Sequence, residues 1–409
     1  MAEASAAVEA VARASYSKLI SFLSARSGDV AGAEDALADA FVAALRTWPT
    51  GGIPSKPEAW LLHAARRRLI DRQRQARTHE ANVPGLVSLL AEAEALSTAS
   101  AFPDRRLELL FVCAHPALDA RVHTPLMLQV VLGLDAAAIA GAFLTPASTM
   151  GQRLSRAKAK IRDTRIAFEV PTGAELERRL SAVLQAIYAA YGHGWEGIDG
   201  ADAERVGLAE EALFLARLLV ERLPEQPEAL GLLALLEHCE ARRAARRSDG
   251  GEYVPMSEQD TRLWNTARLA EAERLLGAAA RLGRPGRFQL EAAVQSAHVE
   301  RCSGGRADWA AIALLYEGLV KLAPTFGALV GRAAAVAAAR GPREGLVLLD
   351  AIPAEAVEHY QPYWATRAHL EQRLGRPREA RAAFDVALRL TQDPAVRRFL
   401  ERAAAGRPR

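Results

Sequence analysis

A dense run of arginines follows an apolar start in the segment AWLLHAARRRLIDRQRQAR, residues 59–77. The segment contains six arginines and a single acidic residue, Asp71. Guanidinium groups pair with phosphate and stack on unpaired bases, so this density of arginine favours a nucleic-acid partner. A helix face that is merely solvated mixes both signs of charge, typically Glu with Lys one turn apart, and this segment does not.

At 100° per residue, the same segment separates into two sides. The apolar side holds Leu61, Leu62, Ala65, Leu69 and Ala76. The opposite side holds Arg66, Arg67, Arg74 and Arg77, with Arg68 and Arg72 at the edge of the apolar stripe and Asp71 between the groups. The sequence therefore predicts a helix with a core face and a cationic face. Trp60 fits either core packing or contact with a base.

A second basic cluster consists of Arg153, Arg156, Lys158, Lys160, Arg162 and Arg165. It belongs to the second of two helices expected over about 135–143 and 147–162. Thr145 suits the N-cap of that second helix and Pro146 its first position. A short helix, a tight turn and a basic helix are typical of a helix-turn-helix. Ser148, Thr149 and Gln152 lie at its start, where side chains reach base edges, while later basic residues meet phosphates.

An acidic helix precedes the arginine helix. A helix is expected over 10–25 and another over 30–48. The apolar face of the second holds Val30, Ala33, Leu37, Phe41, Leu45 and Trp48. Its other face carries Glu34, Asp35 and Asp39, and spacing alone also allows an ordinary solvated acidic face. Ser55 and Glu58 have the spacing of a capping box at the start of the arginine helix.

Beyond Pro171 the pattern changes to paired helices with glycine turns. Gly304, Gly341 and Gly375 are 37 and 34 residues apart. Small residues mark the places where two helices of the last unit touch: Ala365, Ala368, Ala380, Ala383 and Ala387. A period near 34 indicates tetratricopeptide-like repeats, interrupted by a charged loop over 242–262. The expected domains are 8–80, a linker over 81–102, a helix-turn-helix domain over 103–168 and a repeat domain over 169–409.

The composition favours an all-α fold. Half of the 409 residues are hydrophobic and only 6% are aromatic, whereas strands prefer β-branched and aromatic residues. The net charge is +3, and residues 1–168 carry 20 Lys and Arg against 16 Asp and Glu, so the positive excess lies in the N-terminal part. Cys113, Cys239 and Cys302 are too few and too widely spaced for a disulfide framework. Because no apolar run is long enough for a bilayer and the N-terminus is acidic, we expect a soluble cytoplasmic protein.

Motifs for covalent chemistry are missing from the sequence. His298 and Cys302 are four residues apart, but no second pair completes a metal site. The sequence has neither a G-x-x-x-x-G-K phosphate loop nor a nucleophile elbow. We therefore expect no catalytic activity, no metal and no cofactor.

Several stretches together resemble one family. AEDALADAFVAALRTW followed by PSKPEAWLLHAARRRLIDRQRQAR is similar to the second conserved region of bacterial sigma factors of the extracytoplasmic-function type. The stretch from FPDRRLELL to SRAKAKIRD resembles the fourth conserved region. FVCAHPAL and the helical tail resemble the subgroup with a tetratricopeptide-like C-terminal extension. Arg67 stands where this family usually has Asn.

The resemblance implies a sigma-70-type factor that binds core RNA polymerase, recognises promoter DNA, melts the duplex and starts transcription. It places Arg66, Arg67, Asp71, Arg72, Arg74 and Arg77 at the melted strand nearest the start site. It places Ser148, Thr149, Gln152, Arg153, Arg156 and Lys158 at the upstream duplex element. Glu34, Asp35, Asp39 and Phe41 would dock on the clamp helices of the largest polymerase subunit. The tail would bind a protein partner or fold back on the DNA-binding domains.

Two alternatives remain at this point. A helix-turn-helix regulator with a repeat-type sensor domain would bind duplex DNA without polymerase, although it has no need of segment 30–77. A scaffold protein with incidental basic helices would show no salt-dependent affinity for DNA.

Overall fold

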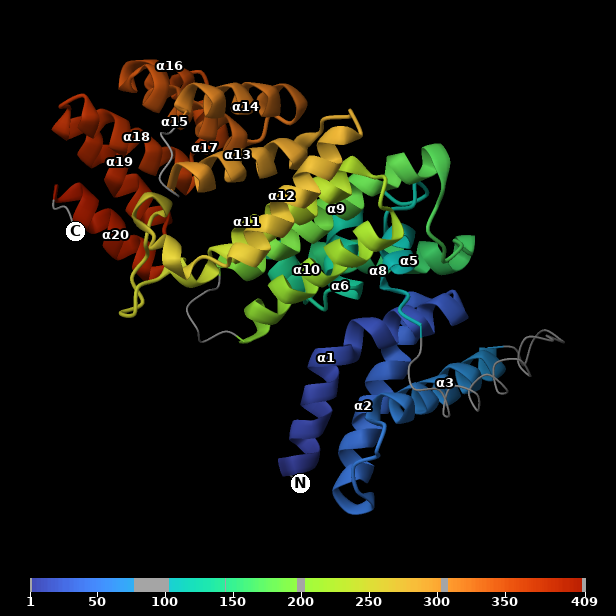
Figure 1. Cartoon of the computed structure of the whole chain (residues 1–409). Coiled ribbons are helices and arrows are strands. Elements are labelled where there is room, and N and C mark those ends of the chain that lie inside the picture. Colours follow the sequence, from blue (N-terminus) through green and yellow to red (C-terminus); the bar gives the residue numbers. More distant parts are fainter. Residues whose placement is uncertain (1, 77–102, 144, 197–202, 303–307, 407–409) are drawn as a thin grey trace. The chain divides into compact units, whose positions relative to one another are not determined.

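The computed structural model describes residues 2–76, 103–143, 145–196, 203–302 and 308–406. Within these ranges the chain forms α-helices and short 3-10 helices, and the β-structure is limited to one isolated bridge between Arg247 and Tyr253. The expected all-α fold is confirmed (Figure 1). The chain divides into two compact units, Met1–Leu218 and Leu219–Arg409.

Three helices at the start of the first unit pack against one another. They are α1 (Ala2–Ser27), α2 (Val30–Gly51) and α3 (Pro57–Ala76), each in contact with the other two (Figure 1). Leu19, Leu37 and Leu61, one from each helix, are fully buried. Gly28 has a φ of 68°, which suits glycine, and Asp29 then caps α2 by accepting a hydrogen bond from the Gly32 amide. Both expected helices are present, and both are longer than the pattern predicted.

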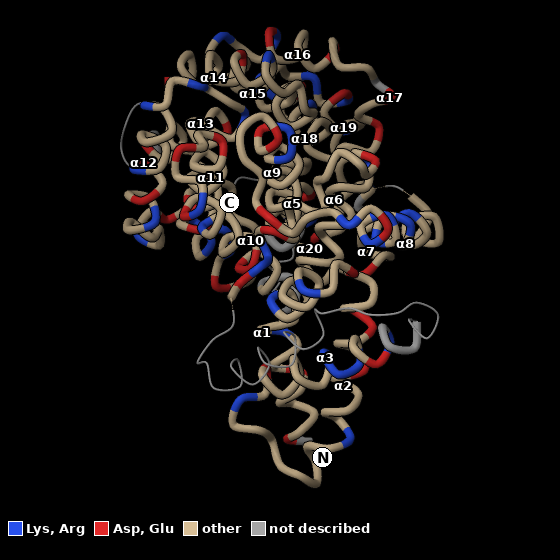
Figure 2. The backbone as a smooth tube through the Cα atoms, turned by 90° about the vertical axis from the view of Figure 1, so that its right-hand side faces the viewer, with Lys and Arg blue, Asp and Glu red and all other residues tan. Residues whose placement is uncertain are grey.

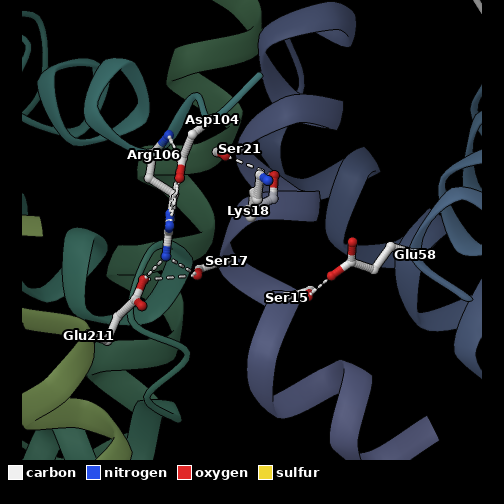
Figure 3. Close-up of polar contacts among 8 residues, drawn as sticks. All are labelled: Ser15, Ser17, Lys18, Ser21, Glu58, Asp104, Arg106 and Glu211. Atoms are coloured by element: carbon white, nitrogen blue, oxygen red, sulfur yellow. Dashed lines mark hydrogen bonds and ion pairs between the residues drawn. The ribbon is translucent and has the colours of Figure 1, made fainter. Parts of the chain in front are cut away.

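The expected capping box at the start of α3 is wrong. The helix begins at Pro57, so Ser55 lies two residues before it. The Glu58 carboxylate instead accepts a hydrogen bond from the Ser15 hydroxyl on α1 (Figure 3). This contact pairs two polar groups across the interface between α1 and α3.

Six further helices follow, of which five belong wholly to the first unit and the last runs from the first unit into the second. They are α5 (Arg106–Cys113), α6 (Ala120–Val130), α7 (Ala136–Ala142), α8 (Ala147–Thr164), α9 (Gly173–Glu196) and α10 (Ala203–Arg222). Helices α7 and α8 lie where the two short helices were expected. The predicted cap of α8 is wrong, because Pro146 occupies the cap position and the Thr145 hydroxyl donates to the Phe143 carbonyl.

Helix α9 packs with the preceding helices. It contacts α5 and α6, and the buried Arg179 guanidinium donates to both the Glu175 carboxylate and the Phe111 carbonyl. The first compact unit therefore extends to Leu218, past the expected boundary after residue 168. The domain ranges 8–80, 103–168 and 169–409 stay predictions, and the linker over 81–102 lies outside the described residues.

A buried guanidinium, that of Arg106, joins three segments of the first unit. It pairs with Asp104 at 2.6 Å, with the Glu211 carboxylate of α10 and with the Ser17 hydroxyl of α1 (Figure 3). Its carbon centre lies 4.3 Å from the ring centroid of Phe214 on α10. Burial opposes ionisation of Asp104, but the hydrogen bonds and charge of Arg106 outweigh it and hold the pKa of that carboxyl below its usual value.

The second unit is a succession of helices that pack mainly on their neighbours in the chain. They are α11 (Pro227–Ala241), α12 (Thr266–Arg281), α13 (Arg287–Cys302), α14 (Trp309–Leu322), α15 (Phe326–Arg340), α16 (Pro342–Asp350), α17 (Ala354–Val357), α18 (Gln361–Arg373), α19 (Pro377–Leu390) and α20 (Pro394–Ala404). Gly341 and Gly375 form turns with positive φ, as their spacing predicted. The first expected turn, at Gly304, lies outside the described residues.

Small residues allow these helices to approach closely. A Cβ atom added at Gly345 of α16 would lie 2.8 Å from the Ala333 carbonyl oxygen of α15. Ala368, Ala383 and Ala387 are buried in the cluster that joins α18, α19 and α20, as expected. This packing fits a repeat architecture, and the tetratricopeptide class stays a prediction.

The expected interruption over 242–262 is present. Its three short 3-10 helices are η1 (Arg243–Arg246), η2 (Met256–Glu258) and η3 (Thr261–Leu263). The segment docks on α20. Arg247 pairs with Asp393, Glu252 pairs with Arg402 at 2.7 Å, and the Tyr253 and Phe399 rings meet edge to face at 5.4 Å.

The fully buried His238 makes the stability of the second unit depend on pH. Burial, assisted by the charge of Arg242, lowers the pKa of His238 on α11 to about 4. Oε1 of Glu273 on α12 lies 3.4 Å from Nε2 of His238. Between that pKa and the ordinary value near 6.5 the unfolded chain binds a proton that the folded chain does not, so stability falls as the pH falls.

We expect the His238→Leu variant to lose this dependence. From about pH 7.5 to about pH 5, the parent should lose about 2 kcal/mol more unfolding free energy than the variant. Urea unfolding followed by circular dichroism at both pH values measures the difference. His359→Leu, at an exposed position, is the control and should keep the parental dependence. Equal pH dependence in His238→Leu and the parent would contradict the assignment.

Candidate nucleic-acid interface

Helix α3 presents part of the predicted cationic face to solvent. Arg67, Arg68, Asp71 and Arg72 are exposed, and Figure 2 shows basic positions on this helix beside acidic ones. The side chain of Arg74 and all of Arg77 lie outside the described residues. Three exposed guanidiniums within two turns can bind phosphates or stack on bases.

Arg66 is not on the cationic face. Its residue is only 7% exposed, and it lines a small cavity with Phe22 and Arg26 of α1 and with Leu69 and Ile70 of its own helix. Ile70 is buried and lies one turn after Arg66 on the same side of α3, so the buried face of this helix includes both residues. The prediction omitted Ile70 from the apolar stripe and so placed Arg66 on the wrong side.

Alanines form much of the buried face of α2. That face consists of Val30, Ala33, Ala36, Leu37, Ala40, Ala44 and Trp48. The prediction that Phe41 and Leu45 belong to the core face is wrong, because Phe41 is half-buried and Leu45 is 45% exposed. The expectation counted large apolar side chains, whereas alanines three or four residues apart allow α2 to approach its neighbours.

An exposed strip therefore runs along α2, and we refer to it as the α2 strip. It consists of Asp35, Ala38, Asp39, Val42 and Leu45, at the spacing of one helix face. Val42 is 47% exposed. Two carboxylates followed by two apolar side chains form a surface suited to a protein partner with basic and apolar groups.

Two roles were predicted for Trp60, core packing and contact with a base, and the structure shows it packed. Its half-buried ring meets the buried Trp48 of α2 edge to face, with the centroids 5.6 Å apart and the planes at 71°. This geometry is favourable for two aromatic quadrupoles.

The acids of the α2 strip pair with an arginine of α3. Arg72 lies 2.9 Å from Asp35 and 3.6 Å from Asp39, measured between guanidinium nitrogens and carboxylate oxygens. Between 45% and 67% of each side chain is exposed, so these pairs contribute under about 1 kcal/mol and exchange readily for other partners.

Helix α8 presents most of its predicted contact residues on one exposed face. Ser148, Gln152, Arg153 and Arg156 are exposed and Thr149 is half-buried, while Met150, Leu154, Ala157 and Ile161 form the buried face. In Figure 2, Lys and Arg positions recur along this helix. A polar start followed by basic residues on one helix face is suited to bases and then phosphates.

Lys158 departs from this pattern and corrects the prediction. It lies two residues after Arg156, and thus roughly 200° around the helix, on the buried side. It is 8% exposed, and its Nζ atom lies 2.6 Å from Oε2 of Glu34 on α2. A lysine placed in this way offers no charge to DNA, and Glu34 offers none to a partner.

The described ranges hold no group of three His, Cys, Asp or Glu side chains arranged to bind a metal ion. In the same ranges, each helix is too short or too polar to cross a bilayer. The predicted contact residues that are exposed form three surfaces: the exposed arginines of α3, the α2 strip and the exposed face of α8.

Comparisons with known proteins match two parts of the chain. Residues 11–79, which include most of α1 and all of α2 and α3, match sigma-70 region 2. Residues 179–280 match a family of unknown function, DUF6596, which extends from α9 to α12 across the division between the two units. No solved structure matches the chain.

A relative shares nearly the whole length of the chain. It is an uncharacterized protein of Rhizobium meliloti (strain 1021), 36% identical over 363 residues, which are 88% of this chain and 86% of the relative. An alignment of this length extends well beyond the residues that match sigma-70 region 2. The N-terminal helices of the chain are thus similar to region 2 of the sigma-70 family.

Proposed function

We propose that this chain is a sigma factor of the extracytoplasmic-function type, which binds core RNA polymerase, directs it to promoters and helps to open the duplex. The observation that carries the proposal is the sigma-70 region 2 match over the three helices whose surface holds Arg67, Arg68 and Arg72. A helix with a packed face and exposed guanidiniums can hold a separated strand while the domain stays folded.

Each surface has a separate role in this proposal. The α2 strip docks on the polymerase, with carboxylates for basic groups and Val42 and Leu45 for an apolar patch. The exposed arginines of α3 capture unstacked bases and phosphates of the melted strand. The exposed face of α8 contacts the upstream duplex, with Gln152 near bases and Arg156 near phosphates. Free energy for melting comes from stacking and phosphate contacts.

The tail has a regulatory or partner-binding role in the same proposal. It is a set of closely packed helices, similar in pattern to tetratricopeptide repeats, and Leu314 and Val347 are 73% and 66% exposed on it.

Holoenzyme reconstitution distinguishes this function from a helix-turn-helix regulator that acts without polymerase. The purified chain should co-elute with core polymerase and support run-off transcription from fragments of the genome of its source. Failure to co-elute, together with binding to duplex DNA alone, would establish the regulator instead.

We expect substitutions in the α2 strip to weaken polymerase binding. The double variant Val42→Asp, Leu45→Asp should lower the affinity for core polymerase by roughly tenfold or more, because an interface core tolerates charge poorly. Both side chains are exposed, so the helix should still fold. Fluorescence titration with core polymerase measures the affinity. The double variant Leu263→Asp, Leu322→Asp, at positions that are 52% and 53% exposed, is the control for two added charges, and equal losses in both double variants would contradict the docking role.

We also expect the two sides of α8 to differ in DNA binding. Arg156→Ala should reduce the slope of log affinity against log salt by about 1, since one phosphate contact is lost. Lys158→Met should leave this slope unchanged, because Lys158 lies on the buried side. Anisotropy titrations of a labelled duplex at several salt concentrations give both slopes. Equal slopes for Arg156→Ala and the parent would remove Arg156 from the interface.

A further inference from the structure

The last three helices of the second unit carry an excess of positive charge. From Arg373 to Gly406 the chain has eight arginines and four acidic residues, whereas residues 219–372 have 18 basic and 20 acidic residues. Helix α19 packs on both α18 and α20 (Figure 1). The charge is therefore concentrated on three adjacent helices.

Four of these arginines are exposed and, within the described residues, make no ion pair. Arg373 ends α18, Arg378 and Arg389 lie near the two ends of α19, and Arg398 lies on α20. The other four bond within the chain: Arg376 to Glu371, Arg381 to Asp385, Arg402 to Glu252, and Arg397 to the Thr391 carbonyl. Half of the guanidiniums are thus available to a partner.

Two of the available arginines lie on the same side of α19. Arg378 and Arg389 are 11 positions apart, which corresponds to about 20° around a helix and about 16 Å along it. A DNA duplex carries about nine phosphates in that length. Arg381 lies between them in the chain, but Asp385 neutralises it at 3.2 Å. Arg378 and Arg389 are therefore spaced to bind phosphates of one duplex, and we refer to these two residues as the α19 arginines.

The side chains of these helices favour a polyanion over a protein as the partner. Among the described residues after Val347, no large apolar side chain is exposed, and protein interfaces need such side chains at their centre. The end of a repeat array needs a polar outer face for solubility, but either sign of charge meets that need. A guanidinium binds phosphate through two hydrogen bonds, which suits it to a nucleic-acid backbone.

We propose that the α19 arginines form a second DNA-binding surface of this chain, which contacts the phosphates of duplex DNA without reading its sequence. The choice of duplex DNA rests on the proposed function, because α8 brings the chain to a promoter. A cationic surface on the same chain then meets that duplex at a high effective concentration. Two weak contacts on one chain thereby give a tighter hold than either alone.

The double variant Arg378→Ala, Arg389→Ala tests the surface in the full chain. Anisotropy titrations of a labelled duplex at several salt concentrations should show the slope of log affinity against log salt reduced by about 2, since two phosphate contacts are lost. The reduction should be the same on a promoter fragment and on an unrelated duplex, because phosphates carry no sequence information.

Two further variants separate loss of charge from loss of folding. Arg281→Ala, Arg340→Ala removes two arginines of the second unit that are also exposed and without an ion pair within the described residues, and it should keep the parental slope. Arg378→Lys, Arg389→Lys keeps both charges on α19 and should also keep it. Circular dichroism monitors the helix content of every variant.

Three outcomes would overturn the proposal. If Arg156→Ala lowers the slope and the α19 double variant does not, the tail surface is wrong and DNA binding through α8 stands. If the parent binds polyglutamate as tightly as the duplex, and the double variant loses only polyglutamate, an acidic protein partner takes the place of DNA. If the parent shows no salt-dependent affinity for DNA at all, the proposed function fails and the tail surface fails with it.

Discussion

A charge removed from water must meet an opposite charge or a strong hydrogen-bond partner, and this constraint decides which helices of the first unit pack together. Arg106 is the central case, since its guanidinium contacts Asp104 beside it, Ser17 of α1 and both Glu211 and Phe214 of α10. Lys158 and Arg179 make comparable contacts from α8 and α9. Each of these cations makes its helix dependent on a distant segment. The first unit is therefore specified by polar contacts as much as by its apolar core.

In the second unit, small side chains also allow close packing of the helices. Gly345 and Ala333 allow α15 and α16 to meet, and Gly231 of α11 lies against the backbone of Gln289 on α13. Glu228 extends this contact by accepting hydrogen bonds from the Phe288 and Gln289 amides at the start of α13. That carboxylate satisfies donors that a helix start leaves unpaired. Close approach and cross-helix capping act here beside ion pairs such as that between Arg268 and the buried Glu237.

Sequence reasoning located the helices and turns whose signals lie within one short stretch of the chain. Periodicity located α1, α2, α3, α7 and α8, and turn chemistry located Gly341 and Gly375. The burial of Lys158 was within reach, because its angle on α8 sets it opposite Arg156. The rotation of α2 was harder, since alanine fits a core and a surface equally well. The contacts of Arg106 with Ser17 and Glu211 were out of reach, because they join residues 89 and 105 positions apart.

The docking of segment 247–253 on α20 has a consequence for how the second unit folds. An open array of helical repeats is stabilised by neighbours alone, and its end repeats fray independently. Here Arg247 meets Asp393 across 146 positions, and Glu252 meets Arg402 across 150. These bonds close the array into a ring, so the last helix orders a loop near the first. Ring closure raises the contact order, which slows folding, and in return it makes melting of the whole array a single cooperative event.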